Sequence, residues 1–577
     1  MRINLLQLLG GDEARERALE ELLSSVISAY EEDVHLDKKI EGYISLVPLL
    51  KKVFEESVEV KVGENSYTLS LESVDKEELL RLFEEKVKGK WLLAVDESQQ
   101  SGDLILNQSY FFRGSLAYGL KVTNKEDEDR EKILAVLSSF KVAEETYPLK
   151  DKLDLQTYIQ NLLVTLYSLI VLIAKGEDVY GVFIDGPLIR DIHHFLFITF
   201  NREELLELFK LDPKLKEELG NEGWISKGFY SEFLGKNITV EVLAGGKLLD
   251  YILSSPAYEE VLELLSGRGH EEEKLRLTFS YYGGWEEVKK RKVIPGIVIY
   301  FFLLRLLSDL AREEGILVHG IVKASHRSKE FLRFYYSKAF TKLAERNLRF
   351  RYKLYGTGLF PVDEDKMLRF SERLKRGEIS RVLLEEMSLT DDHLIAFCLD
   401  FKADRANFTL PVEIRRHRSK RANREEVFEI EKEFRVATAP YGSATTEEQT
   451  FWLERVLLDT ILPQDTYKFY MLYLRTSELK FPLRVEFSAA NLERAKEIAS
   501  VVYLLSSVYR NYGIPVILKY ADFLVRVSTR MIQRLSRGLL KDKLLKELME
   551  VAESLEPGSQ EIMKMLMYEF KRDFYTR

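Results

Sequence analysis

The stretch that decides the fold is Tyr180-Gly181-Val182-Phe183-Ile184-Asp185-Gly186-Pro187-Leu188. An apolar, β-branched run ends in an aspartate that is followed by Gly and Pro, which is typical of a buried strand that ends in a turn. The pattern therefore predicts that a strand carries the carboxylate of Asp185 at its C-terminal end. For one such strand the plainer interpretation, an aspartate that only begins a turn, is the more common one.

A second stretch repeats this pattern, and reads Trp91-Leu92-Leu93-Ala94-Val95-Asp96-Glu97-Ser98. If the two strands share a sheet, Asp96 and Asp185 meet at one edge of it. Carboxylates gathered in this way repel each other unless a cation lies between them, and oxygen-rich sites suit Mg²⁺ or Mn²⁺. The pair therefore predicts a divalent metal site.

The segments between and around these stretches predict an α/β fold, because strand, meander, helix and strand follow one another. We expect four regions: residues 1–90, a helical and hairpin region and possible oligomerisation surface; 91–200, the first part of the core; 201–292, an insertion; and 293–577, the remainder of the core with C-terminal helices. The expected elements include helices at Asp12–Tyr30, Asp37–Ser57, Asp154–Ala174, Val298–Ala311 and Asn491–Tyr509, a hairpin at Val58–Leu71, a turn at Gln99–Asp103, and strands at Phe408–Ile414, Tyr467–Leu474 and Leu483–Phe487.

Composition narrows the class of protein. The chain has 577 residues, of which 46% are hydrophobic and 31% charged, so it is globular. Its single cysteine excludes a disulfide framework and a cysteine zinc site, and favours a reducing cytoplasm. A net charge of −9 argues against a wholly basic surface. The apolar runs Leu162–Ala174 and Ile294–Leu304 are shorter than the ~20 residues that span a bilayer, so no membrane is expected.

Basic residues supply candidate phosphate contacts. Lys323 follows the strand within Gly315–Ser325, where its ammonium group is suited to a phosphate, although it is also typical of a snorkelling surface lysine. Phe334–Tyr355 interleaves cations with aromatic rings, as in a groove that follows a nucleic-acid backbone or in an amphipathic strand. We expect the better nucleic-acid contact from the cluster Arg415, Arg416, Arg418, Lys420 and Arg421.

The familiar catalytic motifs do not occur. The chain has no Walker motif, no His-Glu-x-x-His and no Gly-x-Ser-x-Gly. Carboxylates at strand ends with a nearby lysine fit phosphodiester hydrolysis assisted by two metal ions. A glycosidase that uses a carboxylate pair without metal is a further, weaker alternative.

Several short segments resemble the NurA nucleases. They are Ala94-Val95-Asp96-x-Ser98, Ile184-Asp185-Gly186-Pro187-Leu188, Gly320-Ile321-Val322-Lys323-x-Ser325, Thr390-Asp391, Arg484-Val485-Glu486-Phe487 and the run from Gly513 to Asp522. The resemblance implies a ribonuclease-H-like mixed sheet flanked by helices and cleavage of DNA ends that depends on Mn²⁺ or Mg²⁺. It also implies a homodimer, and a HerA-type hexameric translocase as the partner in recombination, end resection or break repair.

By this resemblance Asp96 and Asp185 are metal-binding carboxylates and Lys323 is a site residue. Asp522 stands where the family usually has His, and a carboxylate there is still a suitable metal ligand. Glu97 replaces a usual Gly, and the helix before Asp185 lacks the family's glutamate, for which Glu97 is a possible substitute; Asn161 and Gln160 are the nearest polar residues. The alternative function is therefore a catalytically weakened DNA-binding adaptor of a translocase. Glu486 is expected to be an ordinary solvent-facing strand residue.

Overall fold

The computed structural model describes residues 34–63, 65–103, 108–123, 131–144, 147–189, 195, 198–209, 228–265, 287–288, 290–323, 328–360, 378–414, 460–463, 466–508 and 513–526. The chain forms two compact units, and both are discontinuous in sequence. The smaller unit consists of Met1–Val74, Ala324–Val412 and Leu472–Pro482, and the larger unit consists of Asp75–Lys323, Glu413–Met471 and Leu483–Arg577. The four regions expected from the sequence stay a prediction.

A mixed sheet forms the centre of the larger unit. Its strands lie in the order β16, β12, β7, β4, β5, β6. Strands β4, β7 and β12 are parallel to one another, whereas β5, β6 and β16 run antiparallel to their neighbours. Their bounds are β4 Trp91–Asp103, β5 Gln108–Lys121, β6 Glu131–Glu144, β7 Val179–Asp185, β12 Leu317–Val322 and β16 Leu483–Ser488.

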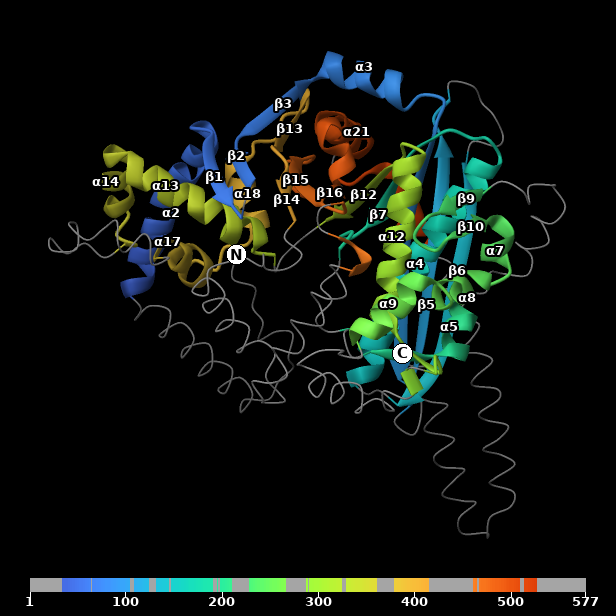
Figure 1. The fold of residues 1–577 in the computed structure, drawn as a ribbon. Coiled ribbons are helices and arrows are strands. Elements are labelled where there is room, and N and C mark those ends of the chain that lie inside the picture. The colour runs from blue at the N-terminus through green and yellow to red at the C-terminus, as the bar shows by residue number, and fades with distance from the viewer. Residues whose placement is uncertain are drawn as a thin grey trace, which may run out of the picture. The chain divides into compact units, whose positions relative to one another are not determined.

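Two long helices cover one face of this sheet. Helix α4 (Tyr147–Ala174) contacts strands β4 to β7, and α12 (Gly296–Glu313) packs beside it, as the neighbouring cyan and green helices in Figure 1 show. Both helices are rich in Leu and Ile, and nearly every residue of α12 from Gly296 to Leu307 is buried. Burial of these side chains is the main source of stability for this layer.

Helix α4 is also, among the described residues, the helix that is long and apolar enough to cross a membrane. Of its most apolar 18-residue window, 83% is buried inside the protein. Such burial is typical of the core helix of a globular unit.

Further elements complete the larger unit. They are α3 Lys76–Lys86, β8 Thr199–Asn201, α5 Arg202–Phe209, β9 Gly228–Ser231, β10 Lys236–Thr239, α7 Val240–Ala244, α8 Lys247–Leu253, α9 Pro256–Leu265, β11 Val293–Pro295, the 3₁₀-helix η5 Ala489–Arg494 and α21 Ala495–Ser507. A helix over 516–526 follows.

The smaller unit contains the hairpin β1 (Val58–Val62) and β2 (Asn65–Leu69), which the sequence predicts correctly. Strand β13 (Arg405–Thr409) pairs with the C-terminal part of β15 (Phe469–Arg475). Its remaining elements are α2 Val34–Glu55, β3 Leu71–Asp75, the π-helix η3 Leu332–Tyr336, α13 Ser337–Arg346, α14 Leu348–Gly356, α17 Glu378–Arg381, η4 Val382–Glu386, α18 Asp391–Cys398 and β14 Val412–Glu413.

Asp391 has a structural role in the smaller unit. Its side chain is fully buried and accepts hydrogen bonds from Ser328 Oγ at 2.6 Å and from the backbone N–H groups of Phe331 and Leu332 at 3.1 and 2.8 Å. It therefore satisfies donors at the start of a helix, where backbone N–H groups lack partners within the helix.

Two local predictions are wrong. The expected turn at Gln99–Asp103 is part of β4, which pairs with β5 along its whole length. The amphipathic strand considered for Phe334–Tyr355 is also wrong, because the segment is helical and buries Phe350 and Leu354 on one side of α14; its alternative as a nucleic-acid groove stays a prediction. The helix expected at Asp12–Tyr30 lies outside the described residues. The mixed α/β prediction is confirmed, and its ribonuclease-H-like detail stays a prediction.

Candidate functional site

Three parallel strands bring Asp96, Asp185 and Lys323 together. In the register of β4 and β7, Val95 lies opposite Ile184, so the next residues along, Asp96 and Asp185, are also neighbours. Strand β12 lies on the other side of β7, with Ile321 opposite Asp185. Lys323 follows β12 directly, and its Nζ donates a hydrogen bond to Asp185 Oδ2. We call Asp96, Asp185 and Lys323 the acid–lysine cluster.

Burial and like charge set the protonation of this cluster. Burial raises the pKa of Asp96 to about 9, the negative charge of Asp185 adds to the effect, and Lys323 only partly opposes it. For Lys323 burial lowers the pKa, but the charges of Asp185 and Asp96 outweigh it and the net shift is upward. Without a bound cation, Asp96 is therefore protonated at neutral pH and Lys323 is charged.

One oxygen of Asp96 lacks a donor. Its Oδ1 accepts a hydrogen bond from the backbone N–H of Glu97 at 2.8 Å, whereas Oδ2 is buried and has no hydrogen-bond partner. While both carboxyl groups are ionised, neither can donate a hydrogen bond to the other, so Asp185 satisfies this oxygen only when one of the two groups holds a proton. A proton shared by the two carboxyl groups, or a cation bound by both, removes this penalty.

The donor set of the cluster fits a hard divalent ion. Mg²⁺ and Mn²⁺ prefer carboxylate oxygens and keep several water ligands, so two aspartates are a sufficient protein contribution. Within the described part of the chain, no group of three or more Asp, Glu, His or Cys side chains is arranged to hold a metal ion. Asp96 and Asp185 would thus hold the ion, with water or substrate completing its coordination.

Asp522 lies near this pair but is not part of a three-acid group. It sits in the helix 516–526, where Arg526 Nε lies 2.5 Å from its Oδ1. Its negative charge contributes to the raised pKa of Lys323, so the helix lies close to the cluster. The assignment of Asp522 as a metal ligand stays a prediction.

Glu97 faces away from the cluster. Adjacent residues of a strand point to opposite faces, so Glu97 and Asp96 lie on different sides of the sheet. Asn161 of α4 donates a hydrogen bond from Nδ2 to Glu97 Oε2 at 2.5 Å, which places Glu97 on the face that α4 covers. This geometry does not favour Glu97 as a substitute for the missing helix glutamate.

The turn after Asp185 depends on two glycines. Gly186 has a φ of +100°, a conformation that other residues rarely adopt, and its N–H donates to Ile321 O at 2.9 Å. A Cβ on Gly320 would lie 2.8 Å from the backbone nitrogen of Leu188. The strand that precedes Lys323 therefore lies directly against the turn that follows Asp185.

The same turn is held by a buried glutamate that the sequence analysis placed wrongly. Glu486 was expected to face solvent, but its exposed fraction is 0%. Its Oε2 accepts a hydrogen bond from the N–H of Leu188 at 2.7 Å, and its Oε1 accepts from Arg484 Nε at 2.8 Å and from Arg484 Nη2. From α12, Tyr300 donates to Leu188 O at 3.0 Å. A charged pair at positions i and i+2 of an otherwise apolar strand was the available signal.

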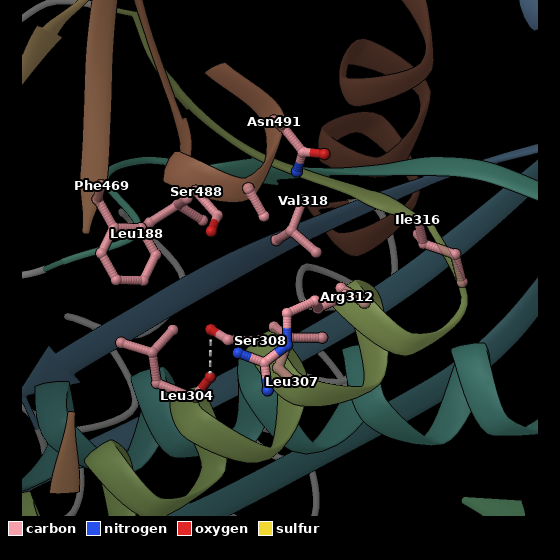
Figure 2. A pocket seen from close by; sticks show the side chains of 12 residues that line it. Leu188, Leu304, Leu307, Ser308, Arg312, Ile316, Val318, Phe469, Ser488 and Asn491 are labelled. Atoms are coloured by element: carbon pink, nitrogen blue, oxygen red, sulfur yellow. Dashed lines mark hydrogen bonds between the residues drawn. The ribbon is translucent and has the colours of Figure 1, made fainter. Parts of the chain in front are cut away.

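The larger unit also has a small pocket that the acid–lysine cluster does not line. Figure 2 shows its mostly apolar lining between α12, the start of β12 and η5; its polar residues are Ser308, Arg312, Ser488 and Asn491. None of Asp96, Asp185, Lys323 and Asp522 lines it. The basic cluster expected to bind nucleic acid, Arg415, Arg416, Arg418, Lys420 and Arg421, lies outside the described residues.

Comparison with known proteins gives one family. Residues 444–527 match the NurA domain, and this range includes the helix that carries Asp522. No curated protein matches the chain. Among solved structures, the NurA nuclease from Sulfolobus solfataricus shows 12% identity and a TM-score of 0.36, covering 89% of this chain and 98% of that one.

A structure of NurA with manganese shows 12% identity and a TM-score of 0.30, covering 92% of this chain and 98% of that one. Likenesses this weak carry no argument. The domain match covers 84 of the 577 residues, so the comparisons show that residues 444–527 are similar to the NurA domain.

Proposed function

We propose that this protein is a nuclease that hydrolyses phosphodiester bonds at DNA ends with the help of Mn²⁺ or Mg²⁺. The observation that carries the proposal is the acid–lysine cluster, in which the buried carboxyl group of Asp96 lies against the carboxyl group of Asp185 beside a charged lysine. The match of residues 444–527 to the NurA domain supports the same reaction class.

Each residue of the acid–lysine cluster has its own role in the proposed reaction. Asp96 and Asp185 would hold the divalent cation, and Asp96 gives up its proton when the cation binds. When bound, the cation supplies a Lewis acid toward the phosphate and acidifies a water molecule. Lys323 donates a hydrogen bond to a phosphate oxygen and offsets negative charge there, as lysine does in many phosphate sites.

The test is cleavage of an end-labelled DNA duplex by the purified chain with Mn²⁺. We expect Asp185→Asn and Asp96→Asn each to lower the rate by about 100-fold or more, since a lost ligand weakens both metal binding and catalysis. Asp250→Asn is the matched control, because Asp250 is an exposed carboxylate paired with Arg202 in the same unit. Cleavage by Asp185→Asn at the wild-type rate would remove the assignment.

A second function, a DNA-binding adaptor with weakened catalysis, is supported by a different observation. Asn161 lies in the middle of α4, its amide donates a hydrogen bond to Glu97, and no third acid joins Asp96 and Asp185 within the described residues. Calorimetric titration with Mn²⁺ separates the two functions. The nuclease requires binding at working concentrations of the ion, whereas the adaptor requires only DNA and partner binding.

The resemblance to the NurA nucleases also suggests an oligomeric state, a cellular compartment and a protein partner. We propose a homodimer in the cytoplasm that works with a HerA-type hexameric translocase in DNA repair, recombination or end resection. Light scattering of the purified chain tests the dimer, and co-elution with such a translocase tests the partnership. A monomer that never co-elutes would contradict both.

A further inference from the structure

The helix 516–526 presents two aromatic rings to solvent. The side chains of Tyr520 and Phe523 are 44% and 62% exposed, and they lie three positions apart, on the same side of the helix. In the described part of the larger unit, the exposed aromatic residues are these two and Tyr230. Two of the three therefore fall within one turn of one helix.

This helix lies over the sheet face that carries Asp96. The ring of Tyr520 packs against that of Tyr118, with centroids 6.0 Å apart and an interplanar angle of 36°. Tyr118 lies opposite Ala94 in the pairing of β5 with β4, and Ala94 precedes Asp96 by two residues, so all three share a face. Asp522 stands between Tyr520 and Phe523 in the sequence, and its negative charge helps to raise the pKa of Lys323. The rings therefore lie beside the acid–lysine cluster.

Cationic side chains accompany the rings. Lys519 precedes Tyr520, and Arg526 follows Phe523 by three positions with a side chain that is 61% exposed while it contacts Asp522. Exposed aromatic faces with adjacent cations are the arrangement that proteins use for single-stranded nucleic acids, because bases stack on the rings and phosphates contact the cations.

We propose that Tyr520 and Phe523 form a stacking platform for unpaired nucleotides, which leads a single-stranded or frayed DNA end to Asp96 and Asp185. The bases of an intact duplex already stack on each other, so the platform selects unpaired bases. The part that leads the strand to the acids rests on the proposed nuclease function; the binding of unpaired bases does not.

The test measures binding without catalysis. Fluorescence anisotropy with a labelled oligothymidylate of about 20 nucleotides, in EDTA and at fixed salt, gives the dissociation constant of the full chain. We expect about tenfold weaker binding for each of Tyr520→Leu and Phe523→Leu, because each stacked base contributes roughly this factor. Phe523→Trp should retain binding since it keeps a ring, and Tyr230→Leu, which removes an exposed ring elsewhere in the unit, should match the wild type.

Unchanged affinity in both leucine variants would overturn the platform. Equal weakening for a blunt duplex and for the oligothymidylate would also contradict it. The platform is likewise wrong if Phe523→Leu alters the mass measured by light scattering while DNA affinity stays constant, since the face would then be a contact between copies of the chain. Loss of binding in the leucine variants, together with full cleavage by Asp185→Asn, would sustain the platform and remove only the assignment of cleavage to Asp96 and Asp185.

Discussion

The backbone N–H of Leu188 donates a hydrogen bond of 2.7 Å to Oε2 of Glu486, a residue 298 positions further along the chain. Leu188 ends the turn that begins at Asp185, and Glu486 is fully buried and paired with Arg484. A charge in such a place is expensive unless all its hydrogen-bonding positions are used. This pair therefore links the position of a site aspartate to a strand on the other side of β12.

Replacement of Glu486 should be strongly destabilising. Glu486→Leu leaves Arg484 buried without its partner and Leu188 without an acceptor, which costs about 3–5 kcal/mol. Glu486→Gln keeps an acceptor and should cost less. Urea denaturation gives the free energy of unfolding, and Glu493→Gln, at an exposed residue of η5, serves as the control. A loss below 1 kcal/mol in Glu486→Leu would show that the pair is not needed.

The stability of the metal-free protein should fall as pH rises. The folded state keeps a proton on Asp96 up to about pH 9, whereas the unfolded chain loses it near pH 4. Between these values the folded state binds more protons, so the contribution of Asp96 is complete below about pH 4 and is lost by about pH 9. Denaturation across this range in EDTA should show a slope of up to ~1.4 kcal/mol per pH unit that Asp96→Asn removes. An equal slope in the variant would assign it to another group.

Binding of Mn²⁺ should release protons. The ion requires ionised oxygens, so it displaces the proton held on Asp96, and affinity should increase with pH up to about 9. Titration calorimetry at pH 7 in buffers of different ionisation enthalpy counts the protons released, and about one per ion is expected. Binding with no proton release would mean that Asp96 is already ionised or takes no part.

Lys323 should stabilise the metal-free cluster. Lys323→Met removes the cation that contacts Asp185, so the two carboxyl groups lose their partner and the protein becomes less stable by roughly 1–3 kcal/mol. Saturating Mn²⁺ should restore part of this loss, because binding to the folded state adds to its stability. Thermal unfolding with and without Mn²⁺ measures both effects, with Lys323→Arg as the conservative control. No recovery in Mn²⁺ would argue against a cation site there.

The core of the site was predictable because its signals are local. An apolar run that ends in Asp-Gly-Pro marks a strand end, and repetition of the pattern at Asp96 predicted a shared edge. The pleat of the strand also excludes Glu97 from the site: Asp96 and Glu97 are adjacent in β4, so their side chains face opposite sides of the sheet.

The remaining features depend on contacts between distant segments. Glu486 is buried because the turn at Leu188 packs closely against Gly320 and donates a hydrogen bond to the Glu486 carboxylate. No local sequence pattern predicts this contact between distant segments. The basic and aromatic pattern of Phe334–Tyr355 was compatible with a strand or a groove. In the smaller unit the segment forms helices, because its apolar side chains are buried along one side of each helix. The exposure of Tyr520 and Phe523 likewise depends on which face of their helix the sheet covers.

The most direct test of the central claim, that Asp96 and Asp185 together hold a divalent cation, is a titration of the full chain with Mn²⁺ followed by electron paramagnetic resonance. The signal of free Mn²⁺ should be suppressed by the wild type and by Asp250→Asn, and should stay that of free Mn²⁺ with the double variant Asp96→Asn, Asp185→Asn. Equal suppression by the double variant would contradict the claim, because the ion would then be bound elsewhere.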